Sequence, residues 1–152
     1  MRTPILALLL AAACAPSFSL PLPERFVALE DQDDARPPYR MRATTPDGVV
    51  LGVRTLDNGV EGSVTFWAEA VTRRLRDQLA YALLADEEVR AKSGEAGRLL
   101  RFGRDLEGHT YRYLVALYVA GDTLFLVEAG GREEPYAALE EAIEAAIADL
   151  SL

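Results

Sequence analysis

The sequence predicts an α+β domain, a mostly antiparallel sheet flanked by two helices. Three observations predict it. Two strand-like segments are joined by a tight turn, apolar residues alternate through much of positions 97–129, and two stretches carry apolar residues at helical spacing. Strands joined by short turns pair antiparallel, and a helix with one apolar face packs that face on a sheet.

The predicted domain, residues 39–152, begins with a hairpin. Residues 39–45 lead into Pro46-Asp47-Gly48, which has proline and glycine where a tight turn favours them. The second strand, residues 49–56, is rich in β-branched residues and ends before an Asp-Asn-Gly sequence.

Ser63 then predicts the start of a helix, because a serine hydroxyl caps the free N–H groups of a first turn. The apolar stripe expected to be buried comprises Val64, Trp67, Ala68, Val71, Leu75 and Leu79. Residues 81–84 and 88–92 are weaker strand candidates, separated by Ala85-Asp86-Glu87.

A three-stranded meander is predicted over residues 97–129, with turns near residues 105–109 and 121–122. Its middle strand places Tyr111, Tyr113, Val115, Leu117 and Val119 on one face. A single helix is expected over residues 133–150, and its buried stripe comprises Tyr136, Leu139, Ile143, Ile147 and Leu150.

Residues 1–13 have the pattern of a secretory signal peptide. A short positive start precedes an apolar run over residues 5–13, which is too short for the roughly 20 residues that span a bilayer. Small residues close the run, and Cys14, the only cysteine, follows. The pattern resembles a bacterial lipoprotein signal, although Ala11 stands where leucine is usual.

The resemblance implies that Cys14 receives lipid, becomes the new N-terminus and anchors the chain in a membrane. Ala15 after the cysteine implies the periplasmic side of the outer membrane if the host is Gram-negative. Two alternatives are an ordinary cysteine in a signal cleaved later and an uncleaved anchor.

Residues 14–38 are expected to form an extended tether. Five of the eight prolines lie here, together with the acidic run at residues 30–34. Residues 26–29 are apolar enough to dock on the domain as a short edge segment. The acidic run lacks the spacing of an EF-hand calcium loop, which favours a solvated segment.

The predicted elements resemble the PsbP-like fold. The resemblance rests on the hairpin, a helix that opens with Phe66-Trp67, a meander containing Gly108-x-x-Tyr111-x-Tyr113, and an amphipathic final helix. It implies an α/β/α sandwich, found in a photosystem II extrinsic protein and in many small bacterial secreted proteins and lipoproteins. It implies binding, adaptor or assembly roles and transfers no site residue.

Composition excludes several functions. The 24 acidic and 16 basic residues leave a formal net charge of −8, which disfavours nucleic-acid binding. One cysteine and one histidine disfavour a zinc site, and no cofactor is expected. His109 is expected in a solvated turn, and the adjacent acids at 87–88, 133–134 and 140–141 point apart, so no catalytic or metal-binding residue is assigned.

Several strand arginines are candidates for a partner-binding patch flanked by tyrosines: Arg40, Arg42, Arg54, Arg101 and Arg112. The cluster Arg73-Arg74-Leu75-Arg76 is interpreted as a solvated helix surface. We expect a membrane-tethered, non-enzymatic module that binds an envelope protein or assists assembly. The alternatives are a small-ligand or lipid carrier, which needs an apolar cavity between sheet and helix, and a hydrolase with an unrecognised site.

Overall fold

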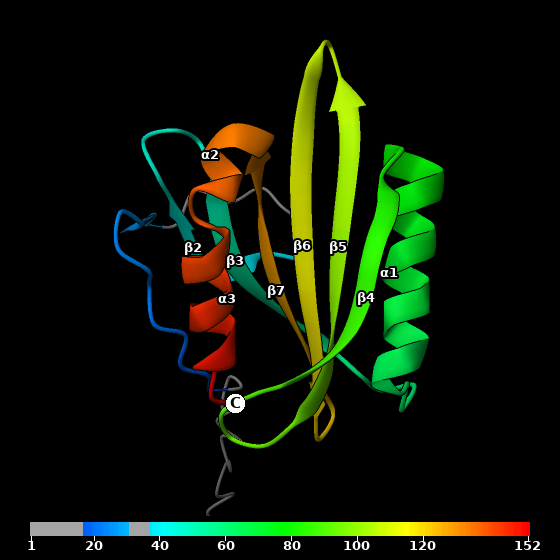
Figure 1. Ribbon diagram of the computed structural model, residues 1–152. Helices are drawn as coiled ribbons and strands as arrows, with labels where there is room; N and C mark the ends of the chain where they lie inside the picture. The colour runs from blue at the N-terminus through cyan, green and yellow to red at the C-terminus, as the bar shows by residue number, and fades with distance from the viewer. Residues whose placement is uncertain (1–16, 31–36) are drawn as a thin grey trace, which may run out of the picture.

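The computed structural model describes residues 17–30 and 37–152, which form one antiparallel sheet with helices on both faces (Figure 1). The elements are β1 (Val27–Ala28), β2 (Tyr39–Thr44), β3 (Val50–Asp57), α1 (Val64–Leu79), β4 (Ala82–Arg90), β5 (Ala96–Leu106), β6 (His109–Ala120), β7 (Thr123–Arg132), α2 (Glu133–Ala137) and α3 (Glu140–Ala148). The seven strands lie in the order β1-β2-β3-β7-β6-β5-β4. The α+β prediction is confirmed.

Strand alternation divides the interior into two apolar cores. Along β6, Leu114 and Ala116 face α2 and α3, whereas Val115 and Leu117 face α1. The same alternation continues in the neighbouring strands, so each face of the sheet is covered by a different helical layer.

The predicted hairpin, first helix and meander are present. Ser63 caps α1 as expected, because its Oγ accepts a hydrogen bond from the Phe66 N–H at 3.1 Å. In the meander, β5, β6 and β7 pair over ten residue pairs at each junction.

The turn of the β5–β6 hairpin is shorter than predicted. Glu107 and Gly108 both have positive φ, 53° and 77°, which is the signature of a two-residue type I′ turn. His109 therefore does not lie in a turn but begins β6, where it pairs with Leu106 and stays exposed.

The two weak strands expected at 81–84 and 88–92 are one strand, β4. The intervening acidic residues stay extended because they pair with β5, and a register shift between Leu83 and Ala85 absorbs the irregularity. β4 is an edge of the sheet and is largely exposed.

The helix expected over residues 133–150 is interrupted. At Leu139 the N–H bonds to the carbonyl of Tyr136 at 2.9 Å, which tightens the chain between α2 and α3. Both residues remain buried, so the predicted stripe persists although the helix does not.

Residues 17–30 pack on the domain, which shortens the tether predicted over residues 14–38. Ser19 and Ser151 exchange backbone hydrogen bonds of 2.8 and 3.0 Å, and β1 pairs with β2 as the docking of residues 26–29 anticipated. Leu20 and Phe26 are each 9% exposed and join the core under α3. Cys14 and residues 31–34 lie outside the described residues.

We expect Phe26→Ala to lower the free energy of unfolding by about 3 kcal/mol, the usual cost of removing a buried phenylalanine. Leu29→Ala is the matched control, since Leu29 is 45% exposed and its loss should cost little. Urea unfolding measures both. A small loss of unfolding free energy in both variants would mean that residues 17–30 do not belong to the cooperative unit.

Candidate functional site

Part of the sheet is not covered by α1, which packs mainly on β4, β5 and β6. On that face β2, β3, β7 and β6 line a hollow that we call the tyrosine trough. Its defining residues are Tyr39, Arg54, Tyr81, Tyr111, Tyr113 and Glu128.

Two glycines let tyrosine rings lie directly on the floor of the trough. A Cβ at Gly52 would lie 2.5 Å from the Tyr39 ring, and a Cβ at Gly130 would lie 2.8 Å from the Tyr113 ring. Any side chain at either position would lift its ring, so the trough depends on these two glycines.

Glu128 is the polar centre of the trough. Its Oε1 accepts a hydrogen bond from the Tyr113 hydroxyl at 2.5 Å, and its Oε2 accepts one from Arg54 Nε at 2.7 Å. Arg54 also donates to the carbonyl of Pro37 at 2.8 Å and lies 3.8 Å from the centre of the Tyr39 ring. These partners hold a largely buried ion pair in one geometry.

Tyr113 and Arg54 both keep their protons at neutral pH, because the pKa of each is raised. Burial raises the pKa of Tyr113, and the charge of Glu128 raises it further, so Tyr113 remains a hydrogen-bond donor. Burial opposes the charge of Arg54, but its hydrogen bond to Tyr39 and the charge of Glu128 raise its pKa. Tyr113 and Arg54 therefore act as fixed hydrogen-bond donors around the Glu128 carboxylate, beside the tyrosine rings.

Pockets of about 210 and 230 Å³ flank the cluster, and both are lined by Tyr113 and Glu128. The larger lies between α1 and the sheet, with Arg74 beside an apolar lining of Leu56, Val71, Leu75, Leu79, Val115 and Leu126. At the α1 C-terminus, Arg104 lies 4.5 Å from the centre of the Tyr81 ring and 5.9 Å from that of Tyr111.

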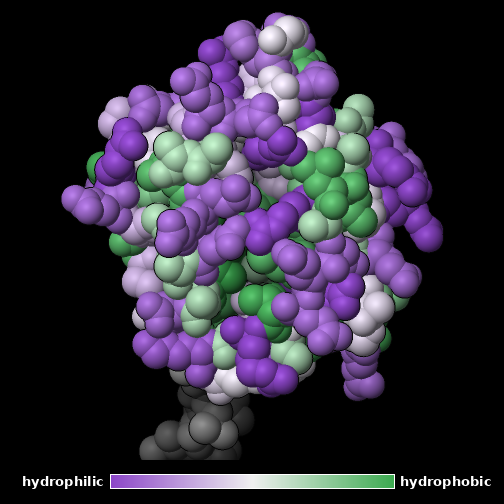
Figure 2. Space-filling model, viewed as in Figure 1, coloured by the Kyte–Doolittle hydropathy of each residue, from purple (hydrophilic) through white to green (hydrophobic). Residues whose placement is uncertain are grey.

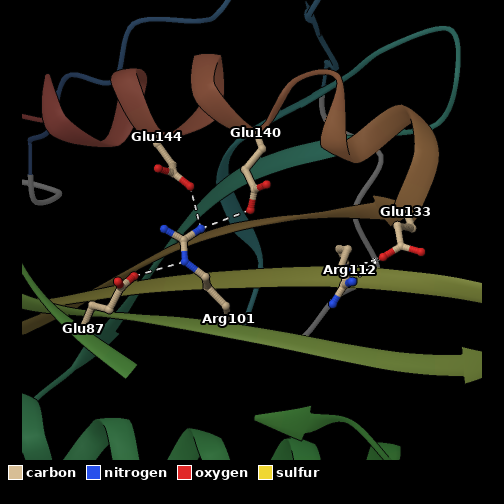
Figure 3. A network of polar contacts seen from close by, with 6 residues as sticks. All are labelled: Glu87, Arg101, Arg112, Glu133, Glu140 and Glu144. Carbon is tan, nitrogen blue, oxygen red and sulfur yellow. Dashed lines mark hydrogen bonds and ion pairs between the residues drawn. The ribbon is translucent and has the colours of Figure 1, made fainter. Parts of the chain in front are cut away.

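The structure divides the predicted arginine patch between the two faces of the sheet. Arg42 joins Arg54 on the trough side, 5.4 Å from the Tyr39 ring centre, and Arg40 is exposed in β2. Arg101 and Arg112 lie on the opposite face, beneath α2 and α3 (Figure 3).

Both arginines on that face are engaged by glutamates. Arg101 lies 3.1 Å from Glu87, 3.2 Å from Glu140 and 2.5 Å from Glu144, while Arg112 pairs with Glu133 (Figure 3). A pocket of about 220 Å³ lies among them. These cations stabilise the attachment of the helices to the sheet rather than forming one surface with Arg42.

The face on which α3 and β4 lie toward the viewer is mostly hydrophilic (Figure 2). Residues 133–150 supply six acids and no lysine or arginine: Glu133, Glu134, Glu140, Glu141, Glu144 and Asp149. The two helices on this face therefore carry acidic residues as their only charged side chains.

Glu128, Tyr81 and Arg104 were not identified as candidate site residues from the sequence. Only Glu128 has a signal in the sequence that could have indicated a site, because it is a single acid inside an apolar strand. Within residues 17–30 and 37–152, no three His, Cys, Asp or Glu residues are grouped to hold a metal ion. No helix in these described ranges is long and apolar enough to cross a membrane.

We expect Tyr113→Phe to cost about 1.5–3 kcal/mol at neutral pH, because it removes a hydrogen bond to a carboxylate. Above pH 10, the ordinary tyrosine value, the unfolded chain loses this proton while folded Tyr113 keeps it. The unfolded state then binds fewer protons, so wild-type stability falls as the pH rises.

Urea unfolding at pH 8 and pH 11 checks both effects. The difference between wild type and Tyr113→Phe should shrink at pH 11. Tyr111→Phe is the control, since Tyr111 lines the same trough but the hydrogen bond to Glu128 Oε1 comes from Tyr113. A constant difference between pH 8 and pH 11 would contradict the assignment.

No known family model and no curated protein matches the sequence. Solved structures do match. LpqN of Mycobacterium tuberculosis, described as involved in cell envelope biogenesis, superposes with a TM-score of 0.71 at 12% identity, covering 90% of this chain and 83% of that chain.

CyanoP, the PsbP of Synechocystis sp. PCC 6803, has a TM-score of 0.67 at 10% identity, covering 89% of this chain and 86% of that chain. PA94 of Pseudomonas aeruginosa, a protein of unknown function, has a TM-score of 0.53 at 15% identity, covering 93% and 87%. The likeness to CyanoP and LpqN shows that the chain has the PsbP-like fold.

Proposed function

We propose that this chain is a lipid-anchored, non-enzymatic protein of a bacterial cell envelope whose tyrosine trough binds an acidic segment of another envelope protein. The observation that carries the proposal is the trough itself. Tyrosine and arginine are enriched in protein interfaces, and here they line a hollow in a sheet face that α1 leaves open.

Charge favours an acidic partner. Arg42, Arg54 and Arg74 line the pockets of the trough, and Glu128 is the one acid among their lining residues. This local positive charge stands on a protein of net charge −8, so it selects the orientation in which an acidic segment approaches. The apolar pocket beside α1 is suited to one aliphatic side chain of that segment.

Two observations support the envelope location. The sequence through Cys14 has the pattern of a lipoprotein signal, and LpqN, which shares the fold, is described as involved in cell envelope biogenesis. The signal predicts lipid on Cys14. This lipid would anchor the protein, because two or more acyl chains hold a protein stably at a membrane.

Intact mass spectrometry of the protein purified from bacterial membranes tests the anchor. We expect a diacyl or triacyl mass on a chain that begins at Cys14, and Cys14→Ala should remove it and release the protein from the membrane fraction. An unlipidated wild-type chain in the soluble fraction would refute the anchor.

Adjacent arginines on α1 provide a matched test of the trough. Arg74 lines the pocket beside the sheet, whereas Arg73 lines a different depression with Glu69 and Leu83. We expect a photo-crosslinking residue at position 111 to capture one envelope protein, and Arg74→Glu to lose this product because it repels an acidic segment.

Arg73→Glu should retain the same product, identified by mass spectrometry, since it changes the charge equally outside the trough. Persistence of the product in Arg74→Glu, or its loss in both variants, would contradict an acidic partner in the trough.

A small-ligand or lipid carrier is a second candidate, because a pocket of about 230 Å³ lies between α1 and the sheet. Ligand sites usually measure roughly 300–1,000 Å³, so this volume favours a single side chain over a whole ligand. A ligand seen in native mass spectra of the wild type and absent from Leu126→Trp would support the carrier instead.

A further inference from the structure

One end of the sheet, which we call the anchor end, collects the segments at both ends of the described chain. The register brings Asp57 opposite Thr123, and the Asn58 N–H bonds to the Asp122 carbonyl at 2.7 Å. The C-terminus and the start of α1 are both at this end, at the bottom of Figure 1. The β4–β5 turn lies there too, because its Ser93 Oγ accepts a hydrogen bond from the N–H of the C-terminal Leu152 at 2.9 Å.

The chain joins the domain at this end. Ser19 pairs with Ser151, and Phe18 packs edge-on against Phe125 with ring centres 6.5 Å apart. Cys14 precedes Phe18 by four residues, which span at most about 14 Å when extended. A lipid on Cys14 would therefore hold the anchor end close to the bilayer instead of leaving the domain on a long tether.

The anchor end also presents exposed apolar side chains. Val60 is 70% exposed and Phe66 is 51% exposed. The Phe66 ring contacts the ring of Trp67, with centres 5.2 Å apart. Aromatic side chains such as Phe66 and Trp67 are favoured at the boundary between lipid headgroups and acyl chains.

Asn58 fixes the loop that carries Val60. Its Oδ1 accepts hydrogen bonds from the Gly62 N–H at 3.0 Å and from Trp67 Nε1 at 2.7 Å, while its Nδ2 donates to the Gly62 carbonyl at 3.1 Å. Asn58 is only 4% exposed. The exposure of Val60 and Phe66 is therefore built into a buried hydrogen-bond network.

We propose that Val60 and Phe66 contact the lipid surface and orient the anchored domain with the anchor end toward the membrane. The inference rests on the proposed lipid anchor. Exposed Asp57, Glu61 and Asp122 surround the loop, so the charge favours a zwitterionic surface over an anionic one. In this orientation the turn between β5 and β6 points away from the bilayer.

The chain supplies its own probes, because Cys14 is its only cysteine and Trp67 its only tryptophan. Residues 14–152, which contain every contact described above, are coupled through Cys14 to a maleimide lipid in phosphatidylcholine vesicles with brominated acyl chains. We expect bromine to quench Trp67 emission, and the double variant Val60→Ser/Phe66→Ser to lose most of this quenching.

Leu106→Ser is the matched control, since Leu106 is 44% exposed but precedes the turn at the opposite end of β5. The Trp67 emission of this variant should be quenched as strongly as that of the wild type. A second reporter, Trp67→Phe with Leu106→Trp, should stay unquenched, and circular dichroism confirms that each variant is folded.

Unquenched Trp67, equal quenching at position 106, or full quenching in the double variant would each overturn the proposal. No quenching of Trp67 emission in the vesicles is the result expected if Val60 and Phe66 contact a protein partner instead of lipid. Because the lipid is attached chemically, these outcomes do not depend on whether cells modify Cys14, which intact mass decides separately.

Discussion

The register of the β3-β7-β6-β5 ladder is the constraint on which the rest of the structure depends. Each central strand alternates apolar side chains between two cores, so a slip of one residue would send every core side chain to the wrong helical layer. The same register places Gly52 opposite Glu128 and Tyr113 opposite Gly130, which assembles the polar centre of the trough. Fold and candidate site are thus specified by one set of backbone pairings.

Charge is distributed by the same alternation. Arginines from different strands emerge on opposite faces, where Arg54 meets a single carboxylate and Arg101 meets three. The helices on one face carry acids that complement Arg101 and Arg112, and this pairing leaves the trough as the face with local positive charge. An acidic protein thereby presents a basic surface without a separate basic segment.

Much of the fold was predictable because its signals are local. The hairpin followed from its Pro-Asp-Gly turn and β-branched second strand, and the meander from period-two alternation. Ser63 marked the start of α1 through its capping hydroxyl. The continuity of β4 was not predictable, since Asp86 and Glu87 favour a turn until pairing with β5 holds them extended. The trough needed long-range information, because Arg54 and Glu128 are 74 residues apart and no spacing rule joins them.

The acidic edge of the sheet has a consequence for crowding. β4 presents Asp86, Glu87 and Glu88 in succession, and Glu88 is the most exposed of the three, with 91% of its side chain accessible. If two copies met along this strand, like charges would face each other before the backbones could pair. Proteins confined to a surface meet far more often than proteins in solution. Under the proposed lipid anchor, this row of carboxylates would oppose the joining of neighbouring copies into continuous ribbons.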